Sequence, residues 1–590
     1  MEIYSSRKIH FEQELNELKK KYNLLSTIRL VCGILIFISG YYFLKTYDSL
    51  YLTTVFVLVV VFVFLMKKHD KISNQRKLKE AIVAINTDEL NYLNFNKLPF
   101  ENGIEFNDFS HPYCYDLDIF GNHSLFQNLN RTSTFIGKIT LASRLMKSLS
   151  NEEILKNQEA VKELSNKIDW RQNFSAIAKV GKDSKLVYQK IINWSTSESE
   201  EFTLKDTILS FVTPVVITVS FLAYLVTSND LFIKIIGYLF AINLGIIGGF
   251  YKRIKNEINH TTEIDAIVKQ YGLLIESIEN EEFLSDKLNN LKEKLKSENS
   301  KASNELKQLS ELFSRMDTIN NLFVSLVFNG LFLFHVHTLK SLLNWKKNNA
   351  PSLKNWLDVI GEFEMLNSLA NFSYNNSDFV FPEINSEYEI SFTDLSHPLL
   401  NTKTRIGNDV TFQPQSFMIL TGSNMSGKST FLRSLGINMV LAGIGTPVCA
   451  TKANVHPMPI LVSMRLSDSL SDSESYFFAE IKRLKLIMDN LEGNRAFVLL
   501  DEILRGTNSD DKRNGTIEVV KKMISKKAIG AIATHDIEVC LTTNEFPNDL
   551  TNKCFEVEIV NNELDFDYKL RDGICKNKSA TFLMKKMGVI

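Results

Sequence analysis

Four strongly apolar stretches constrain this chain most, because helices of such composition must lie in lipid or deep inside protein. They form two pairs, each split by a short polar break: residues 30–45 with 50–66, and 208–227 with 231–250. Apart from Lys45 and Lys234, these stretches carry no charge. A bilayer core takes about 20 apolar residues per helix, so the pattern predicts two transmembrane hairpins. Tyr41, Tyr42, Tyr47 and Tyr51 cluster at the first turn, where interfacial aromatic residues belong.

Basic residues flank both pairs and are scarce in their turns. They are Lys19, Lys20, Lys21 and Arg29 before the first pair, Lys67, Lys68 and Lys71 after it, and Lys252, Arg253 and Lys255 after the second. By the positive-inside rule, both hairpins start and end in the cytoplasm. We therefore expect an integral, multi-pass protein of the cell (inner) membrane whose soluble parts are cytoplasmic.

Other interpretations of the apolar stretches are weaker. Apolar helices can also be buried in a large protein, but a signal peptide is disfavoured because a second span follows the first at once and no small-residue cleavage site is present. A fifth apolar run, 321–335, is interrupted by Asn329 and is expected to be a core helix.

Overall charge excludes one class of protein. With 67 Lys+Arg and 68 Asp+Glu among 590 residues, the net charge of −1 excludes a globally basic nucleic-acid coat protein. The six cysteines show neither a C-x-x-C pair nor zinc-ligand spacing, so they are expected to be reduced thiols.

The pattern of apolar residues in the soluble parts changes along the chain. Residues 67 to about 205 and 252 to about 372 show apolar residues at helical spacing with little Gly or Pro, and the charged text from Asp286 onward predicts a long helix or coiled arm. From about residue 388, short aliphatic runs alternate with helical segments. That alternation predicts a parallel sheet flanked by helices.

The strongest motif lies in this last part. The strand-like Phe417–Leu420 runs into Gly422-Ser-Asn-Met-Ser-Gly427-Lys428-Ser429, which fulfils G-x-x-x-x-G-K-[ST] before a helix. The glycines let backbone N–H groups face phosphates, Lys428 is placed to reach the β- and γ-phosphates, and Ser429 is a candidate Mg²⁺ ligand. The motif predicts an ATP site.

Two further strand ends complete the predicted site. Phe497–Leu500 ends in Asp501 and Glu502, with Asp501 expected in the Mg²⁺ shell and Glu502 expected to orient or deprotonate water. A third strand ends at His535, which is expected to contact the γ-phosphate or polarise the water.

Together these segments resemble a known family. The segments TGSNMSGKSTFLRSLG, SESYFFAE, LLDEILRGTNSDD and IATHD resemble the C-terminal ATPase domain of MutS mismatch-repair proteins. Upstream, His111-Pro-Tyr-Cys-Tyr-Asp and the text after Ser124 resemble the start of the MutS helical core, Leu357–Ala370 its returning lever helix, and Ser396-His-Pro the entry to the ATPase. The resemblance covers roughly 110–180 and 310–590, so both apolar pairs lie outside it.

The resemblance implies roles for particular residues. ATP contacts fall on a continuous loop and one distant residue near the adenine: Gly422, Ser423, Asn424, Met425, Ser426, Gly427, Lys428, Ser429, Thr430 and Asn408. Mg²⁺ would be held by Ser429 and Asp501, with Glu502, His535 and Lys428 as catalytic groups. Ser475 would point across a homodimer interface at the partner's ATP.

The chain also departs from the family pattern. Ser426 replaces a usual Gly, Tyr476 a Thr, Leu504 a Gly and Lys512 the last Gly of its signature. No counterpart of the family's mismatch-reading domain is found, because a predicted membrane hairpin occupies the N-terminus.

We therefore expect an α/β P-loop NTPase domain of the ABC-type/MutS kind, preceded by an all-α core and lever domain with two transmembrane helical hairpins. The predicted division is a hairpin at 1–75, helical core at 76–205, a second hairpin at 206–251, a helical arm and lever at 252–385, and the ATPase at 386–590.

The expected function is a slow, ligand-regulated ATPase that closes ATP sites across a dimer, moves a clamp or lever, and binds DNA in a mismatch-repair-related role. Two alternatives stay open. One is an ABC-type transport ATPase, disfavoured because the Leu-Ser-Gly-Gly-Gln signature is missing; the other is an ATP-switched membrane scaffold or sensor that binds a protein partner.

Overall fold

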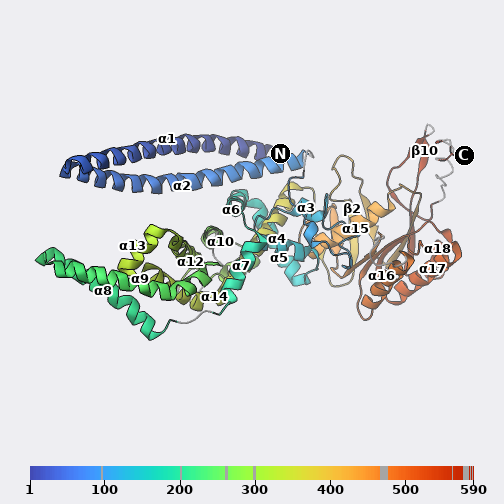
Figure 1. The fold of residues 1–590 in the computed structure, drawn as a ribbon. Coiled ribbons are helices and arrows are strands. Elements are labelled where there is room, and N and C mark those ends of the chain that lie inside the picture. The colour runs from blue at the N-terminus through green and yellow to red at the C-terminus, as the bar shows by residue number, and fades with distance from the viewer. Residues whose placement is uncertain are drawn as a thin grey trace.

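The computed structural model describes residues 1–94, 98–198, 202–259, 264–296, 300–465, 476–560 and 563–575, together with 584, 587 and 589. Helices dominate the chain up to Asn375, and mixed sheets follow from Glu383 onward (Figure 1). The predicted order of a helical part followed by a part containing both helices and strands is therefore confirmed. The finer domain division stays a prediction.

Two long helices form the first hairpin. Helix α1 (Glu2–Thr46) and helix α2 (Ser49–Leu93) pack along each other, and Tyr47 closes the turn in the left-handed conformation while Asp48 caps the start of α2. The rings of Tyr42 and Tyr51 stack at 5.7 Å near the tip. Charged residues dominate the halves nearest the chain's core, so the apolar segments are carried at the far end of the hairpin.

The second hairpin consists of α8 (Leu204–Thr227) and α9 (Asp230–Asn259). A capping box between Thr203 and Asp206 begins α8, and Ser228 ends it in the left-handed conformation. All four hairpin helices are long and apolar enough to cross a membrane by length and composition. Figure 1 shows both hairpins extending toward the same end of the molecule, with the sheets at the opposite end. Membrane crossing itself stays a prediction.

Shorter helices build the body between the hairpins and the sheets. They are η1 (Ile104–Phe106), α3 (Leu125–Leu129), α4 (Phe135–Leu145), α5 (Asn151–Asn166), α6 (Ile168–Val180), α7 (Lys185–Thr196), α10 (Ile264–Asn280), α11 (Asp286–Glu293), α12 (Ala302–Asp317), η2 (Thr318–Asn320) and α13 (Leu322–Phe332). Serine and threonine caps at Ser124, Thr134, Ser150 and Ser184 accept hydrogen bonds from the first turn of α3, α4, α5 and α7. These caps satisfy backbone donors that the helices cannot pair themselves.

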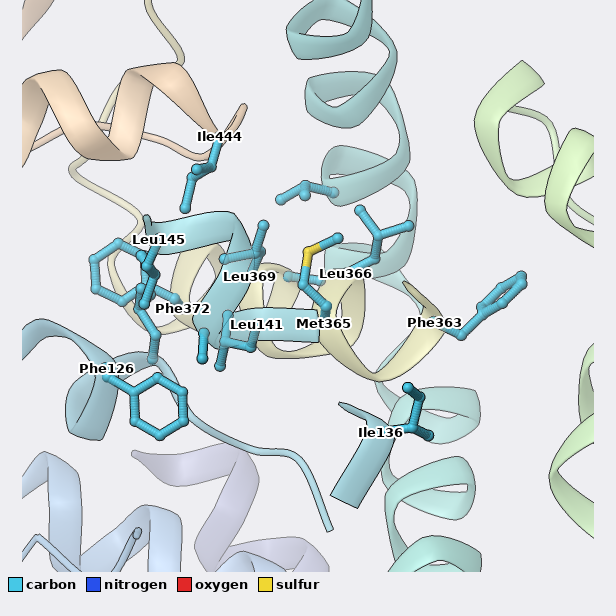
Figure 2. Close-up of a cluster of buried hydrophobic side chains, with 14 of the residues drawn as sticks. Phe126, Ile136, Leu141, Leu145, Phe363, Met365, Leu366, Leu369, Phe372 and Ile444 are labelled. Atoms are coloured by element: carbon cyan, nitrogen blue, oxygen red, sulfur yellow. The ribbon is translucent and has the colours of Figure 1, made fainter. Parts of the chain in front are cut away.

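Helix α14 (Phe334–Asn375) is the spine of this body. Its apolar residues, including Leu366, Leu369 and Phe372, are buried against Leu141 and Leu145 of α4. Figure 2 shows these side chains in one cluster, with Ile444 reaching it from the end of a helix in the C-terminal part. The helical body and the C-terminal part therefore share a core.

A buried carboxylate fixes α4 against α14. Glu364 accepts hydrogen bonds from the backbone N–H groups of Ser133 and Thr134 and from the Thr134 hydroxyl. The two helices approach closely here because Gly137 faces Glu364, and a Cβ on that glycine would lie 2.0 Å from a Glu364 oxygen. Burial raises the pKa of Glu364 to about 7, against the hydrogen bonds that favour its charged form.

A second buried carboxylate joins the first hairpin to α14. Glu89 of α2 is 2% exposed and pairs with Arg131, whose Nε lies 2.5 Å from a Glu89 oxygen. Asn371 and Asn375 of α14 each donate to Glu89 at 2.9 Å. Tyr4 of α1 donates to Asn375 at 2.8 Å. This set of five residues, the hairpin root, fixes the base of the hairpin to the spine.

Two expectations about helices are wrong. The charged segment from Asp286 forms α11, which has only eight residues. It is not a free arm, because Leu288 and Leu291 are buried in the core beside α5. The run 321–335 is not a core helix: within α13 only Asn329 and Gly330 are buried, and Leu322 is 82% exposed. Leu333 then turns the chain by 85° into α14.

A six-stranded sheet lies at the centre of the C-terminal part, in the order β12-β9-β4-β8-β7-β6. All neighbours in it are parallel except β12 and β9. Its strands are β4 (Phe417–Gly422), β6 (Ile460–Ser463), β7 (Phe497–Asp501), β8 (Ile529–Ala533), β9 (Leu550–Phe555) and β12 (Leu570–Asp572). Strands β4, β6, β7 and β8 are buried along their whole length, as apolar strands of a covered parallel sheet must be.

The remaining elements frame this sheet. A four-stranded sheet has the order β1-β5-β2-β3, and β10 pairs with β11. These strands are β1 (Glu383–Ile384), β2 (Ile390–Leu395), β3 (Asn408–Thr411), β5 (Lys452–Val455), β10 (Glu558–Val560) and β11 (Glu563–Asp565). The helices are α15 (Lys428–Gly443), α16 (Tyr476–Asn490), α17 (Ser509–Ser525), α18 (Ile537–Leu541) and η3 (Thr542–Asn544).

Glu364 gives the fold a pH dependence. Since its folded pKa of about 7 lies above the ordinary value of 4.5, the folded state holds a proton that the unfolded state releases, and stability falls as pH rises between these values. The loss is about 3 kcal/mol. Glu364→Gln cannot ionise. We therefore expect its thermal unfolding midpoint to rise relative to that of the wild type as the pH increases from about 5 to 7.5 in detergent solution.

The matched control is Glu311→Gln on the exposed face of α12. It should follow the wild type across the same pH range. A wild type and a Glu364→Gln variant whose midpoints differ by the same amount at every pH would contradict the raised pKa.

Candidate nucleotide site

The loop between β4 and α15 has the geometry that phosphate binding requires. Strand β4 ends at Gly422, and α15 begins at Lys428 directly after Gly427, whose φ of 103° favours glycine. A Cβ on Gly422 would lie 2.9 Å from the Phe555 carbonyl oxygen, so a side chain there would collide with β9. The N-terminus of α15 faces the loop, and the backbone N–H groups of a first helical turn suit an anion.

A pocket of about 410 Å³ opens over this loop. Its walls combine loop residues 424–430 with Asn408, Glu502, Phe555 and Tyr568. Of the predicted ATP contacts, Gly422 and Ser423 lie at the base of the loop outside this lining, and the others line the pocket. The predicted loop and the distant Asn408 are thus brought together.

Lys428 and Ser429 stand where the motif places them. Lys428 is 5% exposed and donates to the carbonyl oxygens of Gly422 at 2.8 Å and Ser423 at 3.0 Å. Burial lowers the pKa of Lys428, opposed by the nearby Glu502 and Asp501 carboxylates. The hydroxyl of Ser429 donates to Asp501 Oδ2 at 2.6 Å across the ends of β4 and β7.

Several buried oxygens at this site have no hydrogen-bond partner within the described part of the chain. They are Asp501 Oδ1, Ser423 Oγ and Ser426 Oγ. Burial also raises the pKa of Asp501. Buried polar atoms are normally paired, so these carboxylate and hydroxyl oxygens fit a hard cation and a phosphate group. The chemistry of Ser429 and Asp501 is that of an Mg²⁺ site with few protein ligands.

Glu502 and His535 form a pair beside this site. His535 Nε2 lies 2.7 Å from Glu502 Oε1, and Arg505 lies 3.5 Å from the other oxygen. The His535 hydrogen bond is the main cause that lowers the pKa of Glu502 to about 2. Glu502 is therefore charged at neutral pH and is a weak base, which favours orienting a water over removing its proton.

The site also contains residues that were not predicted, among them Tyr568 and Glu480. Tyr568 packs on the loop, since a Cβ on Gly427 would lie 3.0 Å from its ring. The side chain of Asn408 donates to the Tyr568 carbonyl at 3.1 Å and accepts from Leu570 N–H at 2.7 Å, so it holds this segment in place. Tyr568 lies far along the chain from the loop and belongs to no recognisable pattern. The pairing of β12 with β9 and the two Asn408 hydrogen bonds bring it there.

The second unpredicted residue is Glu480 of α16. Its carboxylate accepts from the backbone N–H groups of Leu504 at 2.7 Å and Arg505 at 3.2 Å, which ties α16 to the segment after β7. The acidic end of SESYFFAE was the available signal. Ser475, the candidate trans residue, lies outside the described residues, so its role stays a prediction.

The departures from the family pattern have different structural costs. Ser426 is 2% exposed and does not need a positive φ, so it replaces glycine without backbone strain. Leu504 adopts a φ of 61°, a region that costs a non-glycine residue about 1 kcal/mol or more. Its side chain is buried in the core beneath the sheet, which offsets that cost. Nothing in the structure explains Lys512.

Helix α15 carries the loop directly into the helical body. Its last residues meet the region before and within α5: Leu149 N–H donates to the Gly443 carbonyl at 2.9 Å, and Asn157 donates to the Ile444 carbonyl at 3.1 Å. Near its start, Arg433 pairs with Asp118, which also binds Arg465. One helix therefore contacts the candidate phosphate site at one end and the helical body at the other.

This geometry defines the C-terminal part as a domain of helices and strands with a candidate phosphate-binding loop. Comparison with known proteins gives its family: residues 418–589 match MutS domain V. The C-terminal part is thus similar to domain V of MutS proteins, and this match supports a member of the MutS family.

Individual relatives agree with this assignment. The chain is 30% identical over 233 residues to MutS protein homolog 4 of Homo sapiens, covering 38% of this chain and 24% of the relative. It is 29% identical over 256 residues to DNA mismatch repair protein MutS of Clostridium perfringens, covering 42% and 28%, and 31% identical over 235 residues to that of Finegoldia magna, covering 38% and 27%. The chain thus matches about a quarter of the length of these relatives.

The site predicts that nucleotide binding depends on Lys428. Lys428→Ala removes a buried ammonium from the loop, and losing a charge-assisted hydrogen bond of about 2–3 kcal/mol should weaken ATP binding roughly 30- to 150-fold. Binding of a fluorescent ATP analogue by the detergent-solubilised chain measures this. Lys452→Ala, an exposed lysine on β5, is the control and should bind normally. Equal ATP affinity in both variants would show that the loop is not part of the binding site.

Proposed function

We propose that this protein is a membrane-anchored MutS-like ATPase, built on a P-loop NTPase domain, that hydrolyses ATP and uses it to move its helical body. The observation that carries the proposal is the meeting of Ser429, in the first turn of α15, with Asp501, Glu502 and His535 at the ends of β7 and β8. They lie beside a pocket lined by the loop. Similarity to the MutS family supports the same activity.

In the proposed mechanism the loop N–H groups and Lys428 bind the β- and γ-phosphates. To do so, the Lys428 ammonium exchanges its two backbone carbonyl partners for phosphate oxygens. Ser429 and Asp501 would hold Mg²⁺, which supplies charge neutralisation at the phosphates when bound. Glu502 orients the attacking water, and His535 holds the Glu502 carboxylate by its hydrogen bond.

Movement is proposed to pass along α15. Because Gly443 and Ile444 are hydrogen-bonded to the helical body, a shift of the loop on binding ATP displaces Leu149 and Asn157 with it. Asp116 adds a second link, since it accepts from the backbone of Met464 and Arg465 and pairs with Arg483 of α16. Both links join the nucleotide domain to the segment that begins the helical body.

Partners are proposed from the family. A homodimer in which Ser475 of each chain faces the other chain's ATP would place two sites at one interface. Two of the relatives are named as DNA mismatch repair proteins, and we propose DNA as the ligand that the helical body grips.

The hairpins are proposed to anchor the chain in the cell membrane, with the body and nucleotide domain in the cytoplasm. Support comes from four helices of sufficient length and composition, from their common direction in Figure 1 and from the basic residues at their bases. The apolar tip of α1 spans about 25 Å over residues 30–46 at 1.5 Å per residue, close to the hydrocarbon thickness of about 30 Å.

Glu502→Gln tests the ATPase. The change keeps the size of the side chain but removes the charged acceptor of the His535 hydrogen bond, so turnover should fall about 100-fold while ATP binding remains. Phosphate release by the full chain in lipid nanodiscs, measured with and without duplex DNA, gives the rate.

Its control is Glu518→Gln, an exposed glutamate on α17. That variant should turn over like the wild type. Equal rates for both variants would place catalysis elsewhere, and a rate that DNA leaves unchanged would count against DNA as the ligand.

Cysteines at the hairpin tips test membrane crossing. Ser49→Cys and Thr227→Cys replace exposed residues at the two turns, and Leu284→Cys replaces a residue that is 90% exposed in the cytoplasmic body. An impermeant maleimide applied to intact cells should label the two tip positions, and Leu284→Cys only after lysis. Labelling of all three positions only after lysis would rule out hairpins that cross the membrane.

A further inference from the structure

Helix α13 differs from the other short helices in what its surface presents. Phe323, Leu326 and Phe332 are 72%, 46% and 46% exposed, and Leu322 and Phe328 are exposed beside them. From Thr318 to Leu339 the chain contains no Asp, Glu, Lys or Arg. A run of exposed apolar side chains without a charged residue is unusual on a protein surface in water. It marks a contact with lipid or with another protein.

The buried side of α13 is attached to the second hairpin. Asn243 of α9 donates to the Gly330 carbonyl at 2.9 Å, and both residues are buried. A Cβ on Gly330 would lie 2.2 Å from the ring of Phe240, so the two helices touch through the glycine. Small residues at such contacts are typical of helices packed in membranes.

The position of this contact along α9 gives its depth relative to the charged end of that helix. Asn243 precedes Lys252, the first charged residue after the apolar stretch, by nine residues. At 1.5 Å per residue the contact lies about 13 Å inside the charged end of α9. In Figure 1 α13 lies beside α9, away from the sheets. The contact is thus level with the apolar part of the hairpin rather than with its base.

Both ends of α13 return to the same side. It follows α12 and η2 and turns at Leu333 by 85° into α14, and both α12 and α14 belong to the buried core of the helical body. With 11 residues, α13 is about 16 Å long, against a hydrocarbon thickness of about 30 Å, so it is too short to cross.

The polar groups of α13 are satisfied within the protein, as lipid requires. Asn329 Oδ1 accepts from the backbone N–H of His335 at 2.9 Å, and Asn329 Nδ2 donates to Ser325 Oγ at 3.3 Å. Asn321 caps the first turn by accepting from Val324 N–H. The first charge after the turn, Lys340, lies over the ring of Phe211 near the start of α8, at the level where a lysine can reach a headgroup.

From these observations we infer that α13 is a re-entrant helix embedded in the cytoplasmic leaflet, with its exposed face against lipid acyl chains. The inference rests on the proposed membrane anchoring by α8 and α9. It adds a lipid contact that belongs to the helical body itself, directly before the spine α14. Lipid is favoured over a protein partner because the face continues that of the hairpin and carries no charged group for specific pairing.

Spin labels on the full chain in liposomes test the inference. Single cysteines at Phe323 and Leu326 are placed in a Cys575→Ser background, where the other five native cysteines are buried. Collisions with oxygen, which concentrates in lipid, are compared with collisions with a water-soluble nickel complex. Leu222→Cys, 56% exposed on α8, reports on the hairpin, and Leu284→Cys reports on water.

We expect oxygen collisions to exceed nickel collisions at Phe323→Cys and Leu326→Cys, as at Leu222→Cys and opposite to Leu284→Cys. Nickel-dominated collisions at 323 and 326 with a lipid signal at 222 would overturn the re-entrant helix and leave the anchor intact. A water signal at 222 as well would overturn both. Exclusion of both agents with dipolar broadening at 326 would show that a second copy covers α13 and would also overturn the inference.

Discussion

The burial of Glu364 against the start of α4 is the contact around which the helical body is assembled. Through it α14 holds α4, and the cluster between these two helices receives Ile444 from the end of α15. Further along α14, Asn371 and Asn375 hold Glu89 of the first hairpin. At the other end, α14 begins directly after the turn from α13. One helix thus aligns the nucleotide domain, the hairpin root and the apolar face of α13.

Several groups of the candidate site are hydrogen-bonded to one another, although three of its buried oxygens have no partner among the described residues. Lys428 is bonded to its own loop, Ser429 to Asp501 and His535 to Glu502, while Asn408 holds the segment of Tyr568 over Gly427. A ligand must exchange the internal bonds of Lys428 for its own. The net gain on binding is therefore smaller than the sum of the new contacts, because each broken bond offsets part of it.

Local patterns predicted much of this arrangement. The spacing from Gly422 to Ser429 and the strand ends at Asp501 and His535 are short-range signals, and the structure brings those residues together as expected. The hydrogen bond between Asn408 and Tyr568 joins residues 160 positions apart, and no local pattern encodes such a contact. The apolar run of α13 gave the right element but the wrong environment, because periodicity cannot distinguish a face against protein from a face against lipid. The prediction of a long helix or coiled arm from Asp286 was wrong for a similar reason. The heptad-like charges there surround two leucines that pack on α5.

The hairpin root has a mechanical consequence. Glu89 uses both oxygens to bind Arg131, Asn371 and Asn375, so the base of the first hairpin is held by several bonds rather than by one. The second hairpin is a separate attachment, linked to the same body through α13 and α14. Under the proposed membrane anchoring, the body is held at two points in the bilayer and cannot swivel about either of them. Any bending of α14 would then change the spacing or tilt of the two hairpins, and the membrane would resist it as an elastic load on the proposed nucleotide cycle.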